Sequence, residues 1–160
     1  PRPPAAVRRS RCSLGRATRD VPICHHGGGV SCVRATRLGD ATNPRLRSIN
    51  PTTGAVTTRA GSGTAGFADG SSNTAQFDNP SGVAVAPGGT VYVADRYNHR
   101  IRAINPTTGA VTTLAGSGTA GFADGPGDTA QFTGPIGLTV APNGTVYLGD
   151  YFNHRIRTIT

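Results

Sequence analysis

The stretch INPTTGAVTTRAGSGTAGFADG, residues 49–70, returns as INPTTGAVTTLAGSGTAGFADG at residues 104–125, and this repeat decides the fold. The two copies differ only at Arg59 and Leu114, and the second begins 55 residues after the first. A fixed period of this size is typical of solenoids and propellers, so it outranks any local motif.

The same offset extends beyond the quoted stretch on both sides. It relates the segment Asp95 to Arg100 to the segment Asp150 to Arg155, and twice this offset relates Leu38-Gly-Asp to Leu148-Gly-Asp. Upstream of Leu38 the match fades. We therefore separate a basic, low-complexity N-terminal segment (1–37), expected to be disordered or a degenerate blade, from a repeat region (38–160) with parts 38–79, 80–133 and 134–160.

Within one repeat the apolar residues follow a period of two, which is typical of strands. Four short β-branched runs, at residues 83–86, 91–93, 100–104 and 111–114, are separated by turns rich in Gly, Pro and Asn. Four-stranded antiparallel sheets at a fixed period are the blades of a propeller. The sequence thus predicts an all-β partial β-propeller of about two to three blades.

The segment 116–134 links one blade to the next and is rich in glycine. We expect residues 129–132 to form a helical turn that docks Phe132 under the loop. Phe122 is expected to pack in the core as well, and Phe67 and Phe77 hold the same places in the earlier copy.

Residues 80–95 (PSGVAVAPGGTVYVAD) and 98–102 (NHRIR), repeated at 134–157, resemble the NHL repeat. The resemblance covers about residues 38–160, although the first copy has Pro44 where His is expected. It implies a propeller, usually of six blades, that binds protein or RNA, while some related propellers are lyases or lactonase-like hydrolases. Closed propellers need at least four blades. We therefore expect a fragment whose further blades come from a parent chain or from self-association.

The net charge of +8 is uneven, because residues 1–44 hold eight Arg against Asp20 and Asp40. This basic character invites a nucleic-acid interpretation, but the repeats themselves are close to neutral. An Arg-rich start is also typical of organelle transit peptides, and the localisation stays open with a weak lean to an organellar or extracytoplasmic place. No apolar run is long enough for a transmembrane segment.

The turn between two strands carries the most regular polar motif. We expect Asp95 to pair with Arg100 across it, with Asn98 capping the loop, and Asp40 with Arg45 in the first copy. His99 is expected to pack or hydrogen-bond between blades. The next copy repeats these structural roles at Asp150, Asn153, His154 and Arg155.

The same turns carry the candidate binding loops, Arg96-Tyr97 and Tyr151-Phe152. Arg beside aromatic side chains can stack RNA bases, and loops on one propeller face are where a partner is read. The alternative is that these are ordinary exposed loop side chains.

Other motifs favour no catalytic, cofactor-binding or metal site. Two G-x-G-x-x-G matches, starting at Gly61 and Gly116, lack the following helix and acidic residue of a dinucleotide site. Cys12, Cys24 and Cys32 lack the close pairing of a zinc site, and their role stays open.

The sequence is compatible with three functions. We expect a binding scaffold for protein or another ligand, with no cofactor. RNA binding through the Arg and aromatic loops is the alternative, distinguished by its salt dependence. A fragment of a lyase or lactonase-like enzyme is the third, although this chain has no Glu at all.

Overall fold

A computed structural model describes residues 32–35, 43–50 and 52–160, and of residues 32–35 only the backbone. These residues form short strands joined by turns, and one 3-10 turn, η1 (Tyr151–Asn153). No helix among them is long and apolar enough to cross a membrane.

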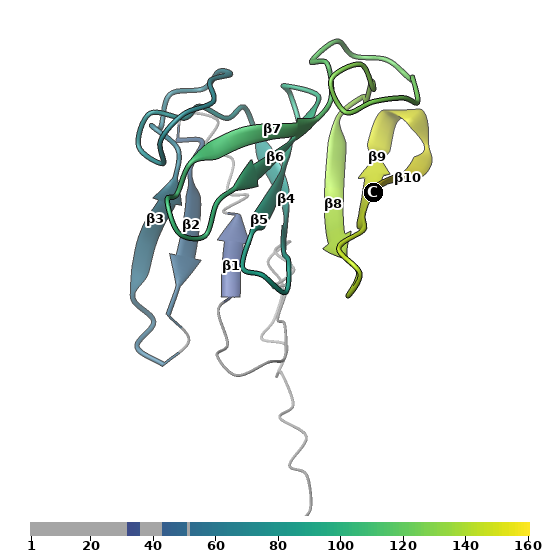
Figure 1. The fold of residues 1–160 in the computed structure, drawn as a ribbon. Coiled ribbons are helices and arrows are strands. Elements are labelled where there is room, and N and C mark those ends of the chain that lie inside the picture. The colour runs from purple at the N-terminus through teal and green to yellow at the C-terminus, as the bar shows by residue number, and fades with distance from the viewer. Residues whose placement is uncertain (1–31, 36–42, 51) are drawn as a thin grey trace, which may run out of the picture.

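The strands form three antiparallel sheets that follow one another along the chain (Figure 1). The first contains β1 (Cys32–Ala35), β2 (Leu46–Ile49) and β3 (Val56–Ala60); the second β4 (Pro80–Val85), β5 (Val91–Asp95), β6 (Arg100–Ile104) and β7 (Val111–Ala115); the third β8 (Pro135–Val140), β9 (Val146–Asp150) and β10 (Arg155–Ile159). Each strand pairs with its neighbour in sequence, as in a meander. The all-β partial propeller predicted from the sequence is confirmed, and we call the sheets blades.

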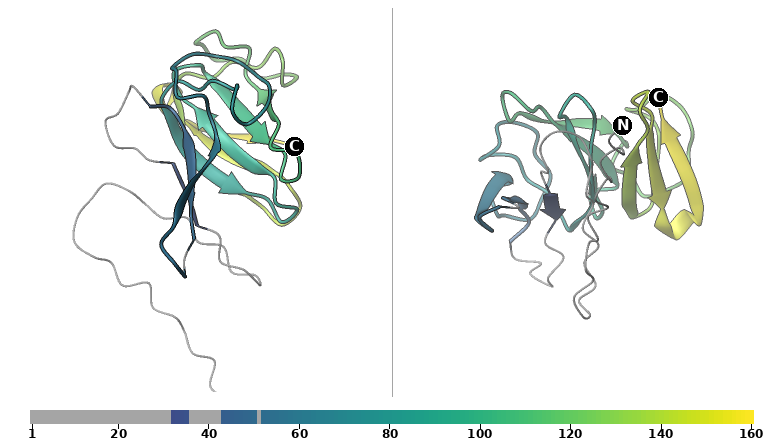
Figure 2. Two further views of the ribbon diagram at one scale, coloured as in Figure 1. Left: turned by 90° about the vertical axis from the view of Figure 1, so that its left-hand side faces the viewer. Right: turned by 90° about the horizontal axis from the view of Figure 1, so that it is seen from below.

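Side chains alternate between the two faces of the central blade, and each face supplies one core. Val83, Val93 and Ile104 pack toward the first blade, whereas Ala84 and Ile101 pack toward the third. The sheets therefore stand face to face, as the view from below shows (Figure 2). The two cores use equivalent positions of successive repeats. The 55-residue repeat therefore reproduces the packing between blades as well as the strands.

The second and third blades approach each other closely at their first strands, β4 and β8. A Cβ on Gly82 of β4 would lie 2.3 Å from the carbonyl oxygen of Ile136 in β8. The Ser81 hydroxyl donates a hydrogen bond to the carbonyl of Pro135 at 3.1 Å. Only glycine allows two backbones to come this close.

The two linkers, residues 61–79 and 116–134, lie over one end of the blades. Each buries one phenylalanine, Phe77 or Phe132, in the core between blades. The prediction that Phe67 and Phe122 are core residues is wrong, because 44% and 46% of their surfaces are exposed. They lie instead against arginine side chains, as described below.

The helical turn predicted at residues 129–132 begins earlier than expected. The N–H groups of Thr129 and Ala130 donate to the carbonyl of Pro126, while Gln131 and Phe132 already form β-bridges. Proline is well suited to start such a turn, because its φ is fixed and it has no N–H to satisfy. Phe132 is thus docked by the bridge that follows the turn.

Several predictions concern residues outside the described ranges. Asp40, Cys12 and Cys24 belong to this group, and for Cys32 only the backbone is described. β1 lies within the segment 1–37 and pairs with β2. The domain boundaries themselves stay predictions.

Candidate functional site

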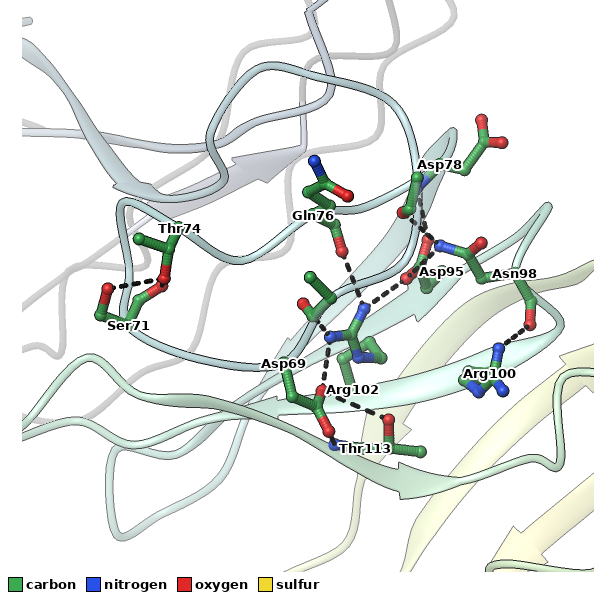
Figure 3. A network of polar contacts seen from close by, with 12 residues as sticks. Asp69, Ser71, Thr74, Gln76, Asp78, Asp95, Asn98, Arg100, Arg102 and Thr113 are labelled. Carbon is green, nitrogen blue, oxygen red and sulfur yellow. Dashed lines mark hydrogen bonds and ion pairs between the residues drawn. The ribbon is translucent and has the colours of Figure 1, made fainter.

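Arg102 of β6 is the centre of a buried polar cluster (Figure 3). Its Nη1 donates to the carboxylate of Asp95 at 2.7 Å and to the carbonyl of Gln76 at 3.0 Å. Its Nη2 donates to Asp69 at 2.6 Å and to the carbonyl of Ala68 at 2.8 Å. One side chain thus joins two strands of the blade to the preceding linker.

The carboxylate of Asp95 is held from further directions. The backbone N–H of Asp78 donates to it at 2.8 Å, and the side-chain amide of Asn98 donates at 2.9 Å. Burial raises the pKa of Asp95, while these hydrogen bonds and the charge of Arg102 oppose the rise. Asn98 also donates to the carbonyl of Gly66 at 2.8 Å, which fixes the β5–β6 turn on the linker.

The third blade repeats this cluster around Arg157. Arg157 donates to Asp150 at 3.0 Å and also to Asp124, and Asn153 donates to Asp150 at 2.8 Å. Recurrence at the same place in the second and third blades suits an architectural role better than a single reactive centre. We therefore interpret both clusters as ties between a blade and its linker.

The expected ion pair between Asp95 and Arg100 is wrong in its partner, because the carboxylate binds Arg102. Arg100 donates to the carbonyl of Ser117 at 2.7 Å and lies 3.8 Å above the ring of Phe67. The equivalent pair fails in the same way: Asp150 binds Arg157, and Arg155 lies 3.7 Å from the ring centroid of Phe122. The physical reason is that alternate residues of a strand share one face. The side chains of Arg100 and Arg102 therefore lie on the same face of β6. The path of the linker that precedes the blade determines which of the two binds Asp95.

His99 forms a hydrogen bond between blades, as the sequence leads one to expect. The N–H of Gly134, the last linker residue before the third blade, donates to its Nδ1 at 3.1 Å. Burial and the charge of Arg100 lower the pKa of His99, while Asp150 acts in the opposite direction. His154, its counterpart, is exposed.

The candidate binding residues come together in one cluster, which we call the aromatic patch: Arg96, Tyr97, Tyr151 and Phe152. The guanidinium carbon of Arg96 lies 5.5 Å from the ring centroid of Tyr97, 5.7 Å from that of Tyr151 and 5.5 Å from that of Phe152. These distances lie within the range of cation–π attraction. Tyr151 and Phe152 contact each other edge to face, with centroids 4.9 Å apart.

The patch spans two blades, because the first two residues follow β5 and the last two form η1 after β9. The linkers position both turns: the N–H of Tyr97 donates to the carbonyl of Asp78, and that of Phe152 to the carbonyl of Thr133. About half of each ring is exposed, with exposed fractions of 54%, 51% and 54% for Tyr97, Tyr151 and Phe152.

The guanidinium of Arg96 lies close to all three rings. Its Nε is buried without a hydrogen-bond partner, and none of the ion pairs within the described residues includes it. The patch therefore offers flat rings around a guanidinium that takes part in no ion pair with the described residues.

Sequence reasoning missed the residues that organise the turns. Arg102, Arg157, Asp69 and Asp124 recur at the 55-residue offset, and a charge inside an apolar strand was the signal that could have identified the two arginines. In the part of the chain that the structure describes, no three His, Cys, Asp or Glu side chains lie close enough to bind a metal.

Comparison with known proteins finds the NHL repeat at two places in the chain, one in the second blade and one in the third. The model of the NHL repeat matches residues 77–104 and 132–159. The chain is 43% identical to Protein SUPPRESSOR OF QUENCHING 1, chloroplastic, of Arabidopsis thaliana over 83 residues. This match covers 52% of this chain and 8% of that protein. It is 38% identical to NHL repeat-containing protein 2 of Bos taurus over 97 residues. This match covers 59% of this chain and 13% of that protein. The chain thus spans a small part of these curated relatives.

Solved structures share the fold. A protein of unknown function from Bacteroides thetaiotaomicron superimposes with a TM-score of 0.72 at 24% identity, over 80% of this chain and 32% of that one. An auxiliary nutrient binding protein from Bacteroides ovatus gives a TM-score of 0.65 at 24% identity, over 81% and 34%. Likeness at this level of identity shows the architecture alone.

Proposed function

We propose that this chain, which carries NHL repeats and folds as part of a β-propeller, is a binding module that holds a protein partner on the aromatic patch. The observation that carries the proposal is the arrangement of three half-exposed rings around the charge of Arg96. Tyr and Arg are enriched among the residues that dominate the binding energy of protein interfaces.

The position of the patch supports this proposal. Its residues come from two blades whose turns are tied to the linkers, so the binding surface is held by the scaffold before any partner arrives. A pre-organised surface loses less conformational entropy on binding. The free charge of Arg96 favours a partner that presents a carboxylate or carbonyl oxygen at the centre of the contact.

Photo-cross-linking tests the proposal directly. A photoreactive phenylalanine analogue at Tyr151 reports contacts of the patch, and the same analogue at the exposed Thr107, in the β6–β7 turn, is the matched control. In cells that produce the protein, we expect nuclease-resistant protein adducts from position 151 but not from position 107, and Arg96→Ala should reduce them. Equal adducts from both positions, or adducts that Arg96→Ala leaves unchanged, would remove the patch from the interaction.

RNA is the second candidate, because Arg and aromatic side chains also form stacking surfaces for unpaired bases. It predicts nuclease-sensitive adducts at position 151 and an affinity that falls steeply with salt. A protein partner held mainly by ring contacts predicts a weak dependence on salt. The two candidates are therefore separated by one experiment.

We propose no catalytic role for the chain itself. Related propeller enzymes need convergent metal ligands or acid–base groups at one place. Titration with a divalent metal tests this part of the proposal, and stoichiometric binding to the purified chain would contradict it.

A further inference from the structure

Phe152, one of the three rings of the aromatic patch, lies directly on the backbone of Gly134. A Cβ on Gly134 would be 2.6 Å from Cδ2 of this ring and 3.8 Å from Nε of Arg96. The backbone φ of Gly134 is 61°, in the left-handed region that glycine adopts without strain. The place of the ring in the patch therefore depends on how the backbone of Gly134 is held.

Residues 133 and 134, which we call the ring support, are held by hydrogen bonds from two blades. The N–H of Thr133 donates to the carboxylate of Asp150 at 2.7 Å, and its carbonyl accepts the N–H of Phe152 at 3.1 Å. Both of these partners belong to the third blade. The N–H of Gly134 donates to Nδ1 of His99 at 3.1 Å, and this bond ties the ring support to the second blade.

The preceding repeat keeps the bonds within one blade but cannot form the bond to a histidine. The N–H and the carbonyl of Asp78, 55 residues before Thr133, form the equivalent bonds at 2.8 and 3.1 Å. The position of His99 is held there by Pro44, whose side chain has no acceptor, and that of Gly134 by Asn79. The histidine and the glycine therefore occur together where a ring lies on the backbone, which indicates that they serve the patch rather than the general architecture of a blade.

His99 can change its charge near neutral pH, unlike the arginines around it. The charged groups that act on its ring are Arg100, beside it on β6, and Asp150, at the end of β9 in the third blade. Arg96 lies against the other side of the ring support, at Gly134. Burial and the charge of Arg100 lower the pKa of His99, so Nδ1 carries no proton near pH 7 and is free to accept the N–H of Gly134.

We propose that His99 and Gly134 are positioning residues of the aromatic patch, and that the patch holds its partner while His99 is neutral and releases it when the imidazole is protonated. Protonation turns the acceptor Nδ1 into a donor, which then opposes the N–H of Gly134. The ring support loses its tie to the second blade, and Phe152 leaves its place beside Arg96. The release rests on the proposed function, because its ligand is the protein partner of the patch.

Fluorine NMR tests the positioning without any partner. A 4-fluorophenylalanine at position 152 of the whole chain reports the surroundings of the ring through its chemical shift. We expect this resonance to titrate with a midpoint below pH 6.5, the ordinary value for histidine. The titration should be lost in His99→Asn and kept in His154→Asn, the matched control. Gly134→Ala should move the resonance already at neutral pH, because the added methyl group displaces the ring.

Photo-cross-linking then tests the release. With the photoreactive analogue at Tyr151, we expect the protein adducts formed in extracts of the producing cells to fall roughly three- to tenfold between about pH 7.5 and about pH 5, the effect of one hydrogen bond. His99→Asn should remove this fall, and His154→Asn should keep it.

The proposal is overturned if the fluorine resonance titrates in His99→Asn as in the unaltered chain, or if the adducts of the two chains fall equally. A chain that forms no adducts at either pH contradicts the proposed function and the release together. In that case the fluorine titration still decides whether His99 positions the ring, so failure of the proposed function is distinguished from failure of the positioning.

Discussion

The guanidinium of Arg102 and the carboxylate of Asp95 form an ion pair at 2.7 Å in which neither side chain has any exposed surface. The pair connects the end of β5 to the middle of β6, and the same guanidinium contacts the linker through Asp69. The burial of both charges makes their pairing obligatory, because a buried charge without a partner is costly.

Removing one member of this pair should therefore destabilise the fold strongly. We expect Asp95→Ala to lower the free energy of unfolding by about 3–5 kcal/mol, because Arg102 would keep its charge in a buried place. Asp124→Ala is the matched control, since it removes an exposed partner of Arg157, and it should cost about 0–1 kcal/mol. Urea unfolding followed by far-UV circular dichroism measures both, and equal costs would contradict the argument.

The same cluster shows how far sequence reasoning reaches. The 55-residue repeat and the period of two placed the strands of the central blade within a few residues of β4 to β7. They also identified Asp95 and Asn98 as structural. They could not identify Arg102 as the partner of Asp95, because the choice depends on Gln76 and Asp69 of the linker, which approach only in the folded chain.

The aromatic patch could be predicted only in part, for the same reason. Arg96 and Tyr97 stood out as a pair beside each other in the sequence, and so did Tyr151 and Phe152. Their meeting in one cluster depends on the packing of two blades, which a local motif does not encode. Phe67 shows the opposite error. An aromatic residue in a linker is expected to lie in the core, but the face of its ring contacts the guanidinium of Arg100.

The close approach of the blades at Gly82 predicts a sharp difference between two equivalent glycines. A methyl group on Gly82 would meet the backbone of Ile136 at 2.3 Å, whereas one on Gly137 of the third blade has no atom within 4 Å. Gly82→Ala should lower the free energy of unfolding by about 1–3 kcal/mol, as overpacking does. Gly137→Ala should leave it unchanged or raise it slightly. Thermal unfolding of both variants checks the prediction, and similar melting temperatures would show that the blades can separate at no cost.

The aromatic patch predicts a separation of binding from stability. Phe152 is 54% exposed, so Phe152→Ala should change the free energy of unfolding by only about 0.5 kcal/mol, as surface substitutions usually do. The same variant should strongly reduce the adducts formed from a photoreactive residue at position 151. Tyr147→Ala on β9, where 40% of the side chain is exposed outside the patch, should leave them intact. Loss of adducts in both variants would indicate a general defect rather than a binding surface.

His99 predicts that the contact between the second and third blades weakens in mild acid. Its Nδ1 accepts the N–H of Gly134 at 3.1 Å, which requires an unprotonated nitrogen, and folding lowers its pKa below the usual 6.5. The unfolded chain consequently binds more protons in the window below about pH 6.5, so stability rises with pH there. The contribution of His99 is complete above that pH and is lost as the pH falls through the lowered pKa of the folded state.

The His99→Asn variant isolates this effect. Asparagine tolerates the left-handed backbone at this position, where φ is 53°, and it does not titrate. We expect the melting temperature of the unaltered chain to fall more between about pH 7.5 and pH 5.5 than that of His99→Asn, by an amount equivalent to at most about 1 kcal/mol, the usual contribution of one hydrogen bond. His154→Asn has the same φ of 53° and an exposed ring, so it should keep the full pH dependence. If His154→Asn rather than His99→Asn flattened the profile, the sensitivity would belong to the exposed β9–β10 turn and not to the contact between blades.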